Sequence, residues 1–158
     1  MRTIATVGVY RSTVDEFLEK LRRHDVAIVI DVRQRRGVRG REYAWANSRR
    51  LQASLAQAGI EYRHLRELAP TTELRQLQYR EDARQNVGKR SRLELDGEYK
   101  RRYLTEVLDK VDLGRFLESL PENRASALLC VERDAAACHR SLIATRLRAQ
   151  FRVPVLDL

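Results

Sequence analysis

The densest group of reactive side chains lies in residues 128–142, "LLCVERDAAACHRSL", which hold two cysteines, a histidine, two arginines and two acidic residues. A thiol near a helix N-terminus and an arginine can have a lowered pKa, which makes Cys138 a candidate nucleophile. His139 beside it is a candidate acid or base. The alternative is structural, because free cysteines such as Cys130 and Cys138 are often small buried residues and a helix histidine is often fully hydrogen-bonded.

Two apolar runs end in an acid followed by an arginine. Glu132 and Arg133 follow one run, and Asp31 and Arg33 follow another. A charge at the end of a buried strand is costly unless it is paired or faces a pocket. We predict that Glu132 and Asp31 orient or deprotonate a reacting group. The alternative for Glu132 is an ion pair with Arg140 or Arg33, and for Asp31 a mutual orientation with Arg33.

The segment 33–50, "RQRRGVRGREYAWANSRR", is rich in arginine and contains two aromatic residues. Guanidinium groups bind phosphates in a bidentate manner, and aromatic rings stack on bases. The alternative is a solvated loop whose aromatic side chains anchor it to the core. A second basic loop lies at 88–92. The residues predicted to bind nucleic acid are Arg35, Arg36, Arg39, Arg41, Tyr43, Trp45, Lys89, Arg90 and Arg92.

Apolar runs and helical periodicity alternate along the chain, which is typical of an α/β protein with a mainly parallel sheet. Strands are expected at 3–9, 26–33, 60–65, 125–131 and 153–158. Between the third and fourth strands, residues 66–120 have no strand pattern and form a predicted helical insert. A helix over 134–151, with Asp134 as its N-cap, follows the fourth strand. We therefore predict one domain, residues 1–158, with a three-layer α/β/α sandwich.

Ligands of open α/β sheets bind beyond the carboxyl ends of the strands. Three predicted strand ends carry polar side chains there, so we expect them to converge on one pocket. The predicted ligand-binding residues are Tyr10, Arg33, Arg133 and Arg140.

The net charge of +9, from 31 basic and 22 acidic residues, favours nucleic acid or a phosphorylated small molecule as partner. High solubility is the alternative reason for this charge. No apolar stretch is long enough to span a membrane, and the first ten residues run directly into a strand pattern, so we expect a cytoplasmic protein without a membrane partner.

The sequence predicts no cofactor and no metal. The two cysteines do not form a disulfide framework, and with only three histidines they do not have the usual spacing of a zinc site. Walker A, Gly-x-Gly-x-x-Gly, His-Glu-x-x-His and EF-hand motifs are absent.

Three segments together resemble the DUF488 family, a domain of unknown function: "TVGVYRSTVDEFLEKL", "VIDVRQRRGVRGREYAWANSRRLQASLAQAGIEYRHLRELAPTTELR" and "LLCVERDAAACHRSLIA". The "RRGVRGREYAWAN" and "ELAPTTELR" segments resemble one subgroup. Many members have Thr-Ile-Gly-His-Ser at the first strand, whereas Val9 and Tyr10 stand in the last two places here. The resemblance implies an α/β sandwich but no established reaction. It implies motif positions for Asp31, Arg33, Glu132, Arg133, Cys138, His139 and Arg140.

Three hypotheses follow from these observations. The first is a protein that binds nucleic acid or a nucleotide, with hydrolysis of an N-glycosidic or phosphoester bond by Glu132 and Asp31. The second is a binding module without catalysis, in which Glu132 belongs to a structural ion network. The third is a small-molecule enzyme that uses the thiol of Cys138.

Overall fold

The computed structural model describes all 158 residues, and its centre is a sheet of five parallel strands in the order β3-β2-β4-β1-β5. This confirms the predicted parallel sheet. β2 and β4 lie inside the sheet and are almost entirely buried because both of their faces are apolar. The strands are β1 Thr3–Val7, β2 Val26–Asp31, β3 Glu61–His64, β4 Ala125–Leu129 and β5 Val155–Asp157.

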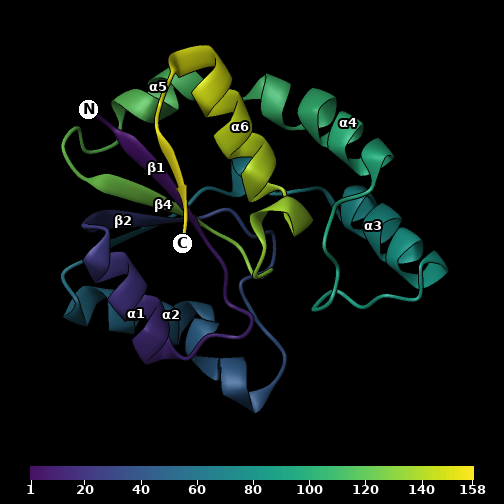
Figure 1. Cartoon of the computed structure of the whole chain (residues 1–158), viewed down its shortest axis with the longest axis horizontal. Coiled ribbons are helices and arrows are strands. Elements are labelled where there is room, and N and C mark those ends of the chain that lie inside the picture. Colours follow the sequence, from purple (N-terminus) through teal and green to yellow (C-terminus); the bar gives the residue numbers. More distant parts are fainter.

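Helices cover both faces of the sheet, which confirms the α/β sandwich (Figure 1). α1 and α2 lie on one side, and α5 and α6 lie on the other. The α-helices are α1 Val14–Arg23, α2 Ser48–Gln57, α3 Thr72–Arg84, α4 Gly97–Glu106, α5 Leu113–Glu118 and α6 Arg140–Phe151. The 3₁₀ helices are Arg41–Ala46, Arg66–Leu68, Leu108–Lys110 and Ala135–Ala137.

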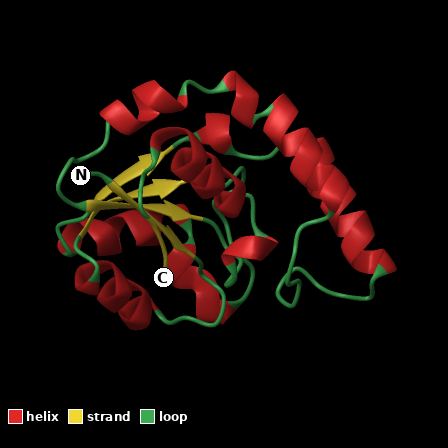
Figure 2. Cartoon of the chain, turned by 45° about the horizontal axis from the view of Figure 1, so that its top comes forward, coloured by secondary structure: helices red, strands yellow, loops and turns green.

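The predicted insert is helical and forms an arc that extends away from the sheet (Figure 2). Its two longer helices begin at side-chain caps: Thr71 accepts a hydrogen bond from the Leu74 amide, and Asp96 accepts hydrogen bonds from the amides of Glu98 and Tyr99. The helices α3 and α4 are joined by residues 85–96. None of the helices in the chain has both the length and the apolar character needed to cross a bilayer.

The ends of the three central strands are held together by main-chain hydrogen bonds. The amides of Val9 and Tyr10, just past β1, donate to the carbonyl of Val131, just past β4. Gly8 makes this approach possible, because a Cβ at this position would collide with the carbonyl oxygen of Glu132. The close contact fixes the path of the chain that follows β4.

The predicted helix over 134–151 is wrong in its first turns. α6 begins only at Arg140, and Asp134 makes no side-chain cap hydrogen bond. The carbonyls of Ala136 and Ala137 accept hydrogen bonds from Leu95 and from the Arg92 side chain instead of continuing a helix. Cys138 therefore lies in extended backbone before the helix, not beyond its first turn.

Candidate functional site

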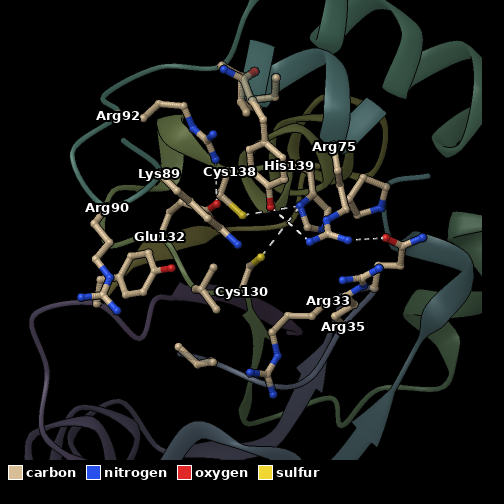
Figure 3. Close-up of a pocket in the computed structure, with 18 of the residues that line it drawn as sticks. Arg33, Arg35, Arg75, Lys89, Arg90, Arg92, Cys130, Glu132, Cys138 and His139 are labelled. Atoms are coloured by element: carbon tan, nitrogen blue, oxygen red, sulfur yellow. Dashed lines mark hydrogen bonds and ion pairs between the residues drawn. The ribbon is translucent and has the colours of Figure 1, made fainter. Parts of the chain in front are cut away.

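A cavity of about 720 Å³ opens at the carboxyl ends of the strands, where the sequence predicts a site (Figure 3). Its floor comes from the residues after β2 and β4 and from those before α6. Its walls come from α3, from the 85–96 segment and from the start of α4. We call this cavity the strand-end pocket.

Cys130, Cys138 and His139 point toward one another at the floor of the strand-end pocket (Figure 3). The Nδ1 atom of His139 lies 3.5 Å from Sγ of Cys138 and 4.0 Å from Sγ of Cys130. The other ring nitrogen, Nε2, is 2.8 Å from the carbonyl oxygen of Val32. A carbonyl only accepts, so Nε2 carries the proton and donates it, and Nδ1 presents its lone pair to the two sulfurs.

Both thiols are buried and unbridged. Hydrogen bonding to Cys138, together with burial, raises the pKa of Cys130 to about 12. A thiol with so high a pKa is protonated at neutral pH and is a poor nucleophile by itself. Chemistry at Cys130 therefore requires a further group that displaces its proton.

Glu132 also lines the strand-end pocket, and only one of its two carboxylate oxygens has a hydrogen-bond partner. Its Oε1 accepts a hydrogen bond from Arg92 at 2.7 Å, whereas its Oε2 is buried without a partner. Burial raises the pKa of this carboxyl group, and the nearby charges of Lys89 and Arg92 act in the opposite direction. Arg92 is shared with Asp82, at 2.6 Å. A buried acceptor without a partner is costly, so Oε2 is suited to meet a ligand or a water.

Asp31, in contrast, is completely satisfied by the protein. One oxygen accepts from Nε of Arg33 at 2.8 Å, and the other accepts from the same guanidinium at 2.8 Å and from the Tyr62 hydroxyl at 2.6 Å. The side chain is fully buried and is not part of the pocket lining. The alternative of mutual orientation with Arg33 therefore describes Asp31, and its predicted part in catalysis has no support from its position.

The wall of the pocket is strongly cationic. Among its charged lining residues, Glu132 is the one acid. Arg35, Arg39 and Lys89 form no ion pair within the chain. Burial by itself would lower the pKa of Lys89, but the combined attraction of Glu132 and the nearby Tyr79, Cys130 and Tyr10 raises it, so this side chain stays charged. The basic lining residues are Arg33, Arg35, Arg39, Arg75, Lys89, Arg90 and Arg92.

Sequence comparison identifies the family. The profile of the family described as "Domain of unknown function DUF488" matches residues 13–147. The chain belongs to the DUF488 family. Neither the curated proteins nor the solved structures include a match to this DUF488 chain.

Two predicted phosphate-binding arginines of the DUF488 chain lie outside the strand-end pocket. The guanidinium of Arg140 is buried and donates to the carbonyls of Glu132, at 2.6 Å, and Arg133, at 2.9 Å. It therefore braces the turn after β4. Arg133 itself is exposed and faces a separate small cavity. The alternative of an ion pair between Glu132 and Arg140 or Arg33 is also wrong, because Glu132 forms its ion pair with Arg92.

The two aromatic residues of the arginine-rich segment are packed against the core. Tyr43 is buried beside Tyr10, with ring centroids 5.3 Å apart, and Trp45 packs on Phe17 at 5.0 Å. The core-anchor alternative therefore describes both rings, and neither is positioned to stack on a base. Of the predicted arginines here, Arg35 and Arg39 line the pocket, whereas Arg36 and Arg41 do not.

Sequence reasoning identified the basic loop of the helical insert, whose Lys89, Arg90 and Arg92 line the pocket, but missed the contribution of the insert's helices. Arg75, Gln78 and Tyr79 on α3 and Tyr99 on α4 all line the pocket. Gln78 and Asp82 are polar yet buried four residues apart on one helix, and they are hydrogen-bonded at 2.9 Å. The sequence alone does not distinguish this buried polar pair from a solvent-exposed one. In either case, polar residues four positions apart weaken the hydrophobic periodicity of the helix.

Proposed function

We propose that this DUF488 protein binds a phosphorylated small molecule, of the size and charge of a nucleotide, in the strand-end pocket. The observation that carries the proposal is the cationic wall around a cavity of about 720 Å³, which lies within the usual range for small-molecule sites. Arg35 and Arg39 have no ion-pair partner within the chain, and Lys89 has only the longer-range attraction of Glu132, which is itself paired with Arg92. They are the side chains that gain most from an anionic ligand.

A recess suits a small ligand better than a polymer. The cations line a concave site, and the aromatic rings once expected to stack on bases are occupied by Tyr10 and Phe17. Nucleic acid remains the competing partner, because the net charge of +9 and the exposed Arg35, Arg39 and Arg41 favour any polyanion.

Hydrolysis of the bound ligand is the activity that we assign to the pocket. Glu132 is its single acid, and its unpartnered Oε2 is suited to hold or deprotonate a water. Asp31 has no part in this proposal, because both of its oxygens are already engaged.

Titration calorimetry with ATP, inorganic phosphate and single-stranded DNA and RNA oligonucleotides, at several salt concentrations, tests the proposal. We expect ATP to bind, and Lys89→Ala to weaken its binding by roughly 10- to 150-fold, because a charge-assisted hydrogen bond contributes about 1.5–3 kcal/mol. Arg50→Ala, which removes an exposed charge on α2 outside the pocket, is the control and leaves the affinity unchanged.

The other outcomes reject the proposal in distinct ways. Tight binding of oligonucleotides that weakens steeply with salt, without binding of ATP, identifies a nucleic-acid-binding protein instead. Absence of binding for every probe at low salt rejects both partners. Hydrolysis that continues unchanged in Glu132→Gln removes the catalytic role of that residue.

A further inference from the structure

The cluster of Cys130, Cys138 and His139 is not explained by phosphate binding. Its donor atoms all lie within 4.8 Å of one another. A ligand anion needs cations and amides, whereas two sulfurs and an imidazole nitrogen are the donors that borderline and soft metal ions prefer. We propose that Cys130, Cys138 and His139 bind one divalent metal ion of the Zn²⁺ class at the floor of the strand-end pocket.

The spacing of the donor atoms supports this assignment. Typical zinc bonds of about 2.3 Å to sulfur and 2.0–2.1 Å to nitrogen, at tetrahedral angles, place N and S about 3.6 Å apart. The Nδ1 atom of His139 lies 3.5 and 4.0 Å from the two sulfurs. The two sulfurs lie within 4.8 Å of each other, against about 3.8 Å in a tetrahedral site, so side-chain adjustments of about 1 Å bring all three donors to bonding geometry.

The orientation of His139 is a second and independent observation. Metal-binding histidines usually donate their other ring N–H to a carboxylate or a carbonyl, which fixes the ring and directs the lone pair at the metal. The 2.8 Å hydrogen bond from Nε2 to Val32 has this role here. A redox pair of cysteines requires no such histidine, so the geometry favours a metal over a disulfide.

Charge balance also favours a divalent ion. Two thiolates and a neutral imidazole carry two negative charges, which a divalent cation neutralises, so the buried complex has no net charge. Mg²⁺ and Ca²⁺ prefer oxygen donors and are not expected to bind.

Three protein ligands leave a fourth position open. All three line the cavity, so this position faces the strand-end pocket. Glu132 is not one of the clustered donors but lines the same cavity, and its Oε2 has no partner within the chain. Three ligands with an accessible fourth position are typical of catalytic zinc sites, whereas structural sites have four protein ligands.

Titration of the reduced, chelator-treated full-length protein with Co²⁺, without oxygen, tests the metal site directly. We expect one equivalent to produce sulfur-to-cobalt charge transfer and the intense visible bands of a tetrahedral ion, and Zn²⁺ to displace it. Because the readout needs no phosphorylated ligand, it is independent of the function proposed above. X-ray absorption of the Zn²⁺ form should show two sulfurs and one imidazole nitrogen at the bond lengths given above, without any variant.

Variants assign the ligands. Cys130→Ser, Cys138→Ser and His139→Gln should each weaken Co²⁺ binding by more than about 100-fold, the upper end of what loss of a supporting contact costs. The matched control is His64→Gln, because His64 also hydrogen-bonds a main-chain carbonyl, that of Arg33 at 2.9 Å, but lies outside the cluster. Circular dichroism of each variant confirms that it is folded.

Several results would overturn the proposal. They are an absence of charge transfer in the wild-type protein, a spectrum of six-coordinate Co²⁺, wild-type binding by any of the three ligand variants, and loss of binding in His64→Gln. Formation of a Cys130–Cys138 disulfide by a protein that binds no Co²⁺ would identify a redox pair instead.

Discussion

β2 ends in an acid, Asp31, and β4 is followed by another, Glu132, each with an arginine within two residues, yet the two acids have different environments. Asp31 at the end of β2 shares both oxygens with Arg33 and Tyr62 and lies outside the pocket lining. Glu132 after β4 uses one oxygen for Arg92, keeps the other without a partner and lines the pocket. A buried acid with all of its hydrogen-bond acceptors engaged stabilises the fold, whereas one with an acceptor left unpaired beside a cavity is available for a ligand.

The largest effect is expected for Asp31→Asn. The substitution leaves the charge of Arg33 buried and unneutralised, which costs about 3–5 kcal/mol of the free energy of unfolding. Urea denaturation measures this loss. The control is Asp25→Asn, because Asp25 forms only an exposed pair with Arg124 and has a φ of 50°, which Asn adopts readily. A loss below about 1 kcal/mol for Asp31→Asn, the range of surface pairs, would mean that this ion pair does not hold β2.

A smaller loss, roughly 1–3 kcal/mol, is expected for Gly8→Ala, because the added Cβ pushes the Glu132 main chain away from β1. The same displacement moves Glu132 and should slow hydrolysis of the bound ligand as well as lower stability. Gly97→Ala is the matched control, since a Cβ at the start of α4 meets nothing within 4 Å. Stability equal to wild type in Gly8→Ala would show that the two strand ends do not need this close approach.

The smallest loss of stability, about 1–2 kcal/mol, is expected for Glu132→Gln. The amide oxygen can still accept from Arg92, which also keeps Asp82 as its charge partner. Hydrolysis of the ligand should be lost although the protein stays folded, as thermal melts and turnover measurements will show. Exposed Arg133→Ala is the neighbouring control, with a change within about 0.5 kcal/mol. If Glu132→Gln destabilised the protein as much as Asp31→Asn, Glu132 would belong to a structural network and the distinction between the two acids would fail.

Much of the fold could be predicted because it depends on local patterns. Uninterrupted apolar runs such as "VAIVID" identify the buried strands, and Thr71 and Asp96 mark where helices begin. The predicted start of the helix over 134–151 is wrong for a non-local reason. The Leu95 amide and the Arg92 side chain donate hydrogen bonds to the carbonyls of Ala136 and Ala137.

The candidate site was predicted only in part. Cys130, Glu132, Cys138 and His139 are close in sequence and follow a buried strand, so their proximity could be expected. The partner of Glu132 could not be predicted, because Arg92 comes from a loop 40 residues earlier, and only the tertiary packing of the helical insert places that loop at the strand ends.

The sequence by itself determined the parallel sheet and the edge at which its polar strand ends lie. The tertiary structure alone decided which acid is satisfied, that Arg140 braces the main chain, and that the Nδ1 atom of His139 faces two sulfurs. The physical reason is that side-chain direction follows a regular period only inside a strand or helix. Beyond the end of β4, it is set by hydrogen bonds to residues that are distant in the chain.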